Sequence, residues 1–178
     1  MRNIIALIIT LLYTVSASAY DMGLGVGFRT NDADSTAPNT PVDGESTIQV
    51  GGIVWIDATE KLIFRTGFMY SQLNFEDKNS GSTVELAYLM IPATLMFKMA
   101  DYGGIFGGVN VGLKASDDCS AGDCQDVDST VTPITIGGYF KVAPQVAVEV
   151  FYESLSGEFV SGLENATSVG ANVLFTFE

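Results

Sequence analysis

The connections between extended segments are the feature that most restricts what this chain can fold into. Eight segments alternate apolar and polar residues with a period of two, which is typical of β-strands with two different faces. They span residues 20–29, 46–57, 61–75, 83–99, 104–114, 132–142, 145–153 and 167–178. The connections alternate strictly between long (30–45, 76–82, 115–130, 154–166) and short (58–60, 100–103, 143–144). Because successive connections of an up-and-down sheet lie at opposite ends, the sequence places every long loop at one end.

The length of these segments indicates a bilayer. Strands of soluble proteins usually have about 5–6 residues, whereas a tilted membrane strand needs about 9–11. Outer-membrane barrels also have an even number of strands, with short periplasmic turns and longer external loops. We therefore predict an all-β fold, an eight-stranded antiparallel up-and-down transmembrane β-barrel, with its apolar faces toward lipid.

Two segments, 46–57 and 83–99, alternate less regularly, and we expect bulges or bends at Gly51-Gly52 and at Pro92. Aromatic residues near the strand ends are expected to form girdles at the two membrane interfaces. These residues are Phe28, Tyr70, Phe75, Tyr102, Tyr152 and Phe177.

The N-terminal segment determines the expected compartment. A positive start is followed by an apolar run from Ile4 to Val15, and Ala17 and Ala19 have the spacing that signal peptidase requires. We predict a cleaved signal peptide at residues 1–19 and a barrel domain at residues 20–178, in the cell outer membrane. The alternative is an uncleaved anchor, which needs about 20 apolar residues to cross the hydrocarbon core. The run is shorter than that.

Composition excludes several classes of function. The chain has a formal net charge of −13, which argues against nucleic acid as a partner. It has no histidine, which removes Ser-His and Asp-His catalysis and the commonest zinc ligand. We expect a protein that is not an enzyme, with no cofactor and no metal site.

Charged residues on the inward face are the candidate functional site. An eight-stranded barrel has an interior just wide enough for side chains to fill. The charged residues with inward parity are Arg65, Lys98, Lys114, Lys141, Glu149 and Glu153. A lone charge in such an interior is costly, so we expect these side chains to pair across it. We favour a plug of salt bridges over the alternative, a small polar path or gated pore.

The most distinctive loop contains both cysteines. Cys119 and Cys124 are a candidate disulfide, since an exported protein meets an oxidising environment. Five acidic residues surround them. Two interpretations stay open, a stapled and solvated loop, which we favour, or a rigid acidic hairpin that binds divalent cations or a partner. The loop lacks the residue order of a calcium-binding hand.

Two local motifs resemble those of bacterial outer-membrane proteins with an OmpA-like, porin-family eight-stranded β-barrel domain. Residues 88–95 are similar to the Y-L-x-I-P strand of this group. The last strand resembles its assembly signal in Ser168, Gly170, Val173, Phe175 and Phe177, although the chain departs from the usual aromatic ending with Glu178. The resemblance implies a Gram-negative outer-membrane location and a structural, adhesive or weak pore role. The expected partners are outer-membrane lipid, lipopolysaccharide and the barrel-assembly machinery, with the protein as a monomer.

Three functions remain open at this level. The first is a structural or surface protein with a side-chain-filled polar lumen. The second is a small pore or a channel for hydrophobic solutes. The third is a soluble lipocalin-like ligand binder, which also has eight strands but keeps its apolar residues inside.

Overall fold

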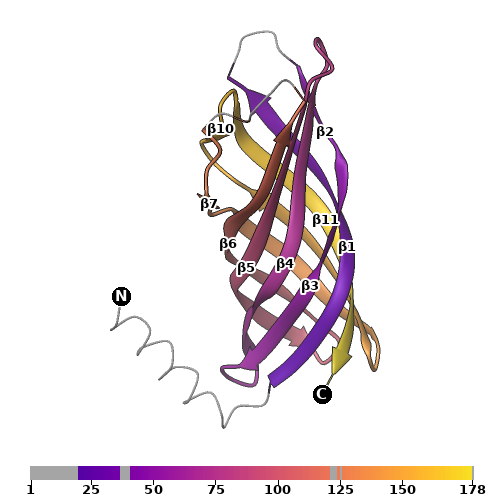
Figure 1. Ribbon diagram of the computed structural model, residues 1–178. Helices are drawn as coiled ribbons and strands as arrows, with labels where there is room; N and C mark the ends of the chain where they lie inside the picture. Colours follow the sequence, from indigo (N-terminus) through magenta and orange to yellow (C-terminus); the bar gives the residue numbers. More distant parts are fainter. Residues whose placement is uncertain (1–19, 37–40, 121–123, 125, 178) are drawn as a thin grey trace, which may run out of the picture.

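The computed structural model describes residues 20–36, 41–120, 124 and 126–177. Eight long antiparallel strands form the barrel: β1 (Tyr20–Ser35), β3 (Ser46–Asp57), β4 (Leu62–Asp77), β5 (Thr83–Ala100), β6 (Gly103–Cys119), β8 (Ile134–Ala143), β9 (Val146–Ser154) and β11 (Leu163–Phe177). They pair in chain order, and β11 pairs with β1 to close the sheet. The predicted eight-stranded antiparallel barrel is therefore confirmed (Figure 1).

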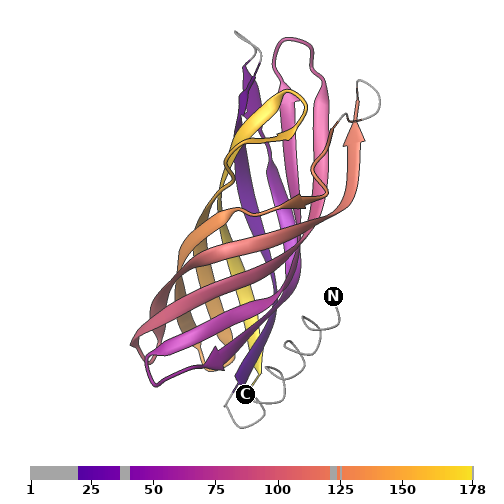
Figure 2. The same cartoon turned by 90° about the vertical axis from the view of Figure 1, so that its left-hand side faces the viewer.

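The two ends of the barrel differ. Residues 58–61, 101–102 and 144–145 make short connections at one end, here called the turn end. The connections at the other end, the loop end, are longer, and they include three short strands, β2 (Val42–Gly44), β7 (Thr130–Val131) and β10 (Glu158–Val160), that the sequence did not predict. In Figures 1 and 2 the loop end is at the top and the turns lie at the bottom; Figure 1 labels β2 and β10 in the upper part of the barrel and β7 lower down, beside β6.

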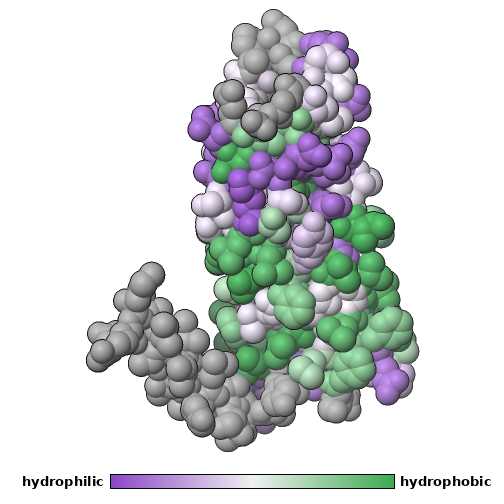
Figure 3. All heavy atoms as spheres, viewed as in Figure 1, coloured by the Kyte–Doolittle hydropathy of each residue, from purple (hydrophilic) through white to green (hydrophobic). Residues whose placement is uncertain are grey.

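The outer surface has an apolar belt in the half nearer the turn end. Every barrel strand contributes exposed apolar side chains, such as Leu24, Val50, Phe68, Leu95, Val109, Ile136, Val150 and Val173. Above this belt the outward residues become polar, as at Thr30, Asp32 and Asp34 on β1. Figure 3 shows the belt as a hydrophobic lower half beneath a hydrophilic upper half. Several strands thus continue well past the belt, which is why β1 and β6 end later than predicted.

The expected bulges lie elsewhere. Of the expected bulges or bends, a bulge at Gly51 and Gly52 is wrong, because the register of β3 with β1 is continuous there. Between β4 and β5 the pairs Arg65–Thr94 and Met69–Met90 share one register, so Pro92 causes no shift either. The register does shift between Ala87 and Tyr88 and again between Lys98 and Ala100, where β5 pairs with β6.

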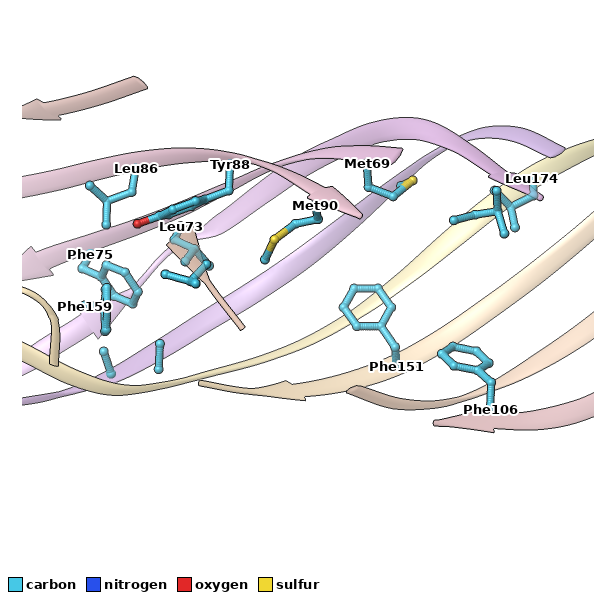
Figure 4. Close-up of a cluster of buried hydrophobic side chains, with 14 of the residues drawn as sticks. Met69, Leu73, Phe75, Leu86, Tyr88, Met90, Phe106, Phe151, Phe159 and Leu174 are labelled. Carbon is cyan, nitrogen blue, oxygen red and sulfur yellow. The ribbon is translucent and has the colours of Figure 1, made fainter. Parts of the chain in front are cut away.

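Apolar side chains also fill much of the interior. Inward residues on β3, β4 and β5 include Ile53, Trp55, Met69, Leu73, Phe75, Leu86, Tyr88, Met90 and Met96, all buried. Figure 4 shows side chains from several strands converging on the lumen. Phe75, expected in an interfacial girdle, instead packs against Phe159 with ring centroids 5.7 Å apart, so that expectation is wrong. Both faces of β3 and β5 are rich in apolar residues, which explains their irregular alternation in the sequence.

The predicted signal peptide, residues 1–19, lies outside the described residues. Within the part of the chain that the structure describes, no helix is long and apolar enough to cross a membrane.

Candidate functional site in the barrel lumen

The first element of the site is an ion pair that crosses the lumen. Arg65 of β4 donates from Nε to Oε1 of Glu149 at 2.8 Å and from a terminal nitrogen to Oε2 at 2.5 Å. Strands β4 and β9 lie four places apart in the eight-stranded order, so this bond spans the barrel. Glu149 is completely buried and Arg65 nearly so. The bidentate geometry is the arrangement that best offsets the cost of burying two charges.

A second buried ion pair lies closer to the loop end, four residues farther along β9. Arg29 of β1 donates to Oε2 of Glu153 on β9 at 2.7 Å. The other oxygen of Glu153 accepts a hydrogen bond from the Asn110 amide of β6. Since β1 and β6 are also four strands apart, Glu153 links opposite walls of the barrel.

Uncharged polar side chains extend this network around the wall. Asn172 donates to Glu149 at 3.3 Å and accepts a hydrogen bond from Gln49, which in turn accepts one from the Ser71 hydroxyl at 3.0 Å. Near the second ion pair, the side-chain oxygen of Asn31 accepts from Arg29 at 3.0 Å and from Ser168 at 2.9 Å. Burial of so many polar groups is affordable only because they bond to one another.

Aromatic rings pack against both guanidinium groups. The Cζ atom of Arg65 lies 4.5 Å from the ring centroid of Phe106, and that of Arg29 lies 5.9 Å from that of Phe151. These contacts are within the range of cation–π attraction. The rings themselves fit because glycines stand beside them: a Cβ atom at Gly137 would overlap Phe106, and one at Gly170 would overlap Phe151.

Apolar layers close the lumen on both sides of the network. Toward the loop end lie Leu73, Phe75, Leu86, Val131, Phe159 and Leu163, and toward the turn end lie Ile53, Trp55, Ile63, Met96 and Leu174. The cavity beside the ion pairs has a volume of about 30 Å³. That is room for about one or two water molecules. A larger cavity of about 240 Å³ lies at the turn end, lined by residues that include Trp55, Lys98 and Lys141.

The structure separates the six charged residues that parity had grouped together. It brings Arg65 to Glu149, and it places Glu153 with Arg29, a residue that the sequence analysis had not included. Lys98 lies at the turn end and pairs with Asp101 at 3.6 Å, while Lys114 pairs with Asp117 at 3.0 Å above the belt. Lys141 lines the turn-end cavity. Parity gives the side of the sheet but not the depth along the barrel, and depth decides which charges meet.

The two cysteines lie at the loop end. The sulfur atoms of Cys119 and Cys124 are bonded to each other. Ser120, next to this disulfide, accepts a hydrogen bond from the backbone N–H of Thr83 at 2.7 Å, which fastens the end of β6 to the start of β5. In the residues that the structure describes, no group of three or more acidic or cysteine side chains is arranged to hold a metal ion.

Two hydrogen bonds hold an acidic side chain in place at the turn between β4 and β5. Asp77 accepts hydrogen bonds from the backbone N–H of Asn79 and from the Ser80 hydroxyl, each at 2.8 Å. These bonds favour the charged form, so the pKa of Asp77 lies below its usual value of 3.8.

The residues of the predicted assembly signal lie on β11, between β1 and β9. Val173, Phe175 and Phe177 point outward within the apolar belt, and Ser168 and Gly170 point inward.

Comparison with known proteins locates this barrel among solved structures. No protein-family model matches the sequence, and no curated protein matches it. Ail, the attachment invasion locus protein of Yersinia pestis, matches with a TM-score of 0.55 at 9% identity, over 88% of this chain and 98% of that one. Neisserial surface protein A matches with a TM-score of 0.56 at 13% identity, over 90% of this chain and 99% of that one. Outer membrane protein AlkL, solved in lipid bilayers, matches with a TM-score of 0.56 at 9% identity, over 90% of each chain.

The chain has the fold of the eight-stranded outer-membrane β-barrels.

Outer-membrane barrels combine an apolar exterior with a polar interior. In this outer-membrane barrel fold, the hydrogen-bonded network around the two ion pairs forms a middle layer of the interior, and apolar layers lie on both sides of it. The sequence analysis missed those apolar layers because it assigned apolar residues to the outer face.

Proposed function

We propose that this protein is an integral outer-membrane β-barrel whose closed lumen acts as a rigid support for the loop end, which projects from the cell surface. We further propose that it is not an enzyme. The observation that carries the proposal is the apolar belt, to which every barrel strand contributes outward side chains in the half nearer the turn end. The fold supports it, since the comparable barrels are outer-membrane proteins.

The belt favours lipid as the surrounding solvent. Outward side chains such as Phe28, Ile48 and Val142 are 61%, 66% and 62% exposed. Soluble proteins rarely expose contiguous apolar patches larger than a few hundred square ångströms. A lipocalin-like binder would hold these side chains inside around a ligand, so the belt argues against that alternative.

The contents of the lumen argue against an open pore. The Arg65–Glu149 pair links opposite walls, Glu153 links Arg29 to Asn110 on the facing wall, and apolar layers lie above and below these groups. The cavity beside the ion pairs has a volume of only about 30 Å³. The two carboxylates of the middle layer, Glu149 and Glu153, are each bound by an arginine, which favours a structural role over acid–base chemistry.

The other expected partners follow from this location. We propose outer-membrane lipid and lipopolysaccharide around the belt, and the barrel-assembly machinery acting on β11 through Ser168, Gly170, Val173, Phe175 and Phe177. We propose a monomer, since the sheet closes on itself and has no edge at the level of the belt.

Cell fractionation with gel mobility tests the proposal. The full-length precursor is expressed, outer membranes are separated, and unboiled and boiled samples are compared on an SDS gel. A membrane band whose mobility changes on boiling is the expected result, because a closed barrel resists the detergent until heated. A protein found only in soluble fractions would overturn the proposal in favour of the soluble binder.

Conductance distinguishes the closed lumen from the pore. Purified protein is added to a planar lipid bilayer under applied voltage. A closed lumen predicts no discrete single-channel steps at protein loads where a porin conducts. Steps that change when Arg65 or Glu149 is substituted would establish the pore instead.

A further inference from the structure

The cavity at the turn end is a vestibule with a defined inner wall. Its volume is about 240 Å³. Trp55 of β3 and Tyr139 of β8 meet across the barrel with ring centroids 5.5 Å apart, and both line the vestibule. Strands β3 and β8 are four places apart in the barrel, so this aromatic pair reaches across the lumen between opposite walls.

Charges of both signs line this vestibule: two lysines stand across it from Asp21 and Asp57, and Asp101 lies beside one of those lysines, Lys98. Asp21 and Asp57 come from the neighbouring strands β1 and β3. Lys98 and Lys141 come from β5 and β8, which are separated by β6 alone. At that level β6 carries Gly103 and Gly104. Because glycine has no side chain, nothing from β6 stands between the two lysines. Strand β6 lies opposite β1, so the basic wall faces the acidic wall.

The ion pair between Lys98 and Asp101 does not block this arrangement. The two groups are 3.6 Å apart, and their side chains are 39% and 103% exposed. Solvent-exposed ion pairs of this kind contribute little to the free energy of folding. A bound carboxylate can therefore replace Asp101 as the partner of Lys98 at small cost.

We propose that the vestibule binds a small zwitterion that carries both an ammonium and a carboxylate group, of the size of a free amino acid or dipeptide. The carboxylate lies toward Lys98 and Lys141, the ammonium toward Asp21 and Asp57, and the apolar part against Trp55 and Tyr139. The volume fits this size, since pockets for drug-sized ligands usually measure about 300–1,000 Å³. A simple anion would face the two aspartates, and a simple cation would face the two lysines, so a ligand with both charges fits best.

The fluorescence of the single tryptophan of the chain can report ligand binding in the vestibule. The sequence contains one tryptophan, Trp55, and it lies in the wall of the proposed site. The protein is purified from outer membranes in detergent micelles and titrated with glycylglycine while tryptophan emission is recorded. A saturable change in emission is expected. N-acetylglycylglycine, which lacks the ammonium, and glycylglycinamide, which lacks the carboxylate, should each bind about threefold to fivefold more weakly, as loss of one exposed ion pair implies.

Matched variants locate the site. Lys141→Met and Asp57→Asn should each weaken glycylglycine binding to a similar extent. Lys61→Met is the control, because Lys61 is at the same end of the barrel but outside the lining of the vestibule. All three variants are first checked for the mobility change on boiling, so that only folded barrels are compared.

Three results would overturn the inference. One is no saturable emission change together with no heat of binding by calorimetry. Another is equal affinity for glycylglycine and its acetylated form, and the third is an equal loss of binding in Lys61→Met. None of these results bears on membrane location or conductance, so the inference and the proposed function fail separately.

Discussion

At the scale of single residues, we expect the stability of the barrel to depend strongly on the ion pair between Arg65 and Glu149. Breaking a buried pair by removing one partner leaves an uncompensated charge and costs about 3–5 kcal/mol. We expect Glu149→Ala to lower the free energy of unfolding by about that much, because Arg65 is then left between Phe106 and the apolar layers. Urea unfolding of the barrel in lipid vesicles measures the change.

The paired replacement is the control for that prediction. Arg65→Leu combined with Glu149→Leu removes both charges, and such replacements of buried pairs are often close to neutral. The double variant is expected to be more stable than Glu149→Ala alone. If the two variants are equally destabilised, the loss comes from packing and the unpaired charge is not its cause.

Close packing of glycine against aromatic rings leads to a second residue-level prediction. A Cβ atom at Gly137 would overlap both Phe106 and the backbone oxygen of Val150, whereas one at Gly107 would lie 3.5 Å from Ile136 in ordinary contact. Gly137→Ala should therefore lower stability by about 1–3 kcal/mol, the usual range for overpacking. Gly107→Ala should change it much less. Heating unboiled samples in SDS and recording the temperature of the mobility change compares the two, and equal temperatures would contradict the packing argument.

Residue-level reasoning from the sequence reached only part of the site. Arg65, Glu149 and Glu153 were correctly placed on the inward face, but Arg29 was left out although it ends an inward-facing run of glycines on β1. The sequence pattern places Lys98 and Lys114 on the inward face together with Arg65, yet these two lysines lie near opposite ends of the barrel. The pairing Arg29–Glu153 depends on the stagger of β1 against β9, which a single sequence does not specify.

At the scale of elements, β10 packs apolar side chains into the lumen at the loop end. Phe159 and Val160 are buried there, and the turns on both sides contain glycines with positive φ, Gly157 and Gly162. The backbone oxygen of Phe159 also accepts a hydrogen bond from the N–H of Asp128 at 3.0 Å, which ties β10 to the connection after β6. The loop-end half of the lumen thus has an apolar core of its own above the belt.

Phe159→Ala tests whether that core is a separate unit. Removing a buried phenylalanine side chain costs about 3–5 kcal/mol. Because the loop end opens to water, we expect this loss to appear as local opening rather than global unfolding. Proteinase K should cleave residues 155–162 in the variant while the barrel keeps its mobility change on boiling. Phe140→Ala, which alters a belt residue of the same type, is the control and should not increase cleavage there.

The elements themselves were largely predictable, for a physical reason that also explains the exceptions. Strands with glycine or polar residues inward, such as β1 and β9, alternate clearly because their two faces meet different environments. In β3 and β5 the inward residues Ile53, Trp55, Met90 and Met96 are apolar too, so their pattern is blurred. The short strands β2, β7 and β10 have two or three residues each, too few to show any period.

At the scale of the whole molecule, the apolar belt indicates which part of the barrel surface faces lipid and which part faces water. Val26 lies in the middle of the belt on β1, 50% exposed, whereas Thr30 is on the same face of the same strand above it. An arginine on the lipid face of a barrel costs about 2–4 kcal/mol at the bilayer midplane and about 0–1 near the interfaces. In water, neither position would penalise a charge, because both side chains already face the solvent.

Val26→Arg and Thr30→Arg therefore measure where the membrane lies. We expect Val26→Arg to lower the free energy of unfolding in lipid vesicles by about 2–4 kcal/mol, and Thr30→Arg to lower it by less than about 1 kcal/mol. The two variants share a strand, a face and a charge, so their difference reports depth alone. If Val26→Arg instead leaves stability unchanged and increases solubility without detergent, the belt faces water and the barrel is a soluble protein. If both variants are destabilised equally, the bilayer reaches above Thr30, and the outward residues Asp32 and Asp34 of β1 mark its upper limit on this strand.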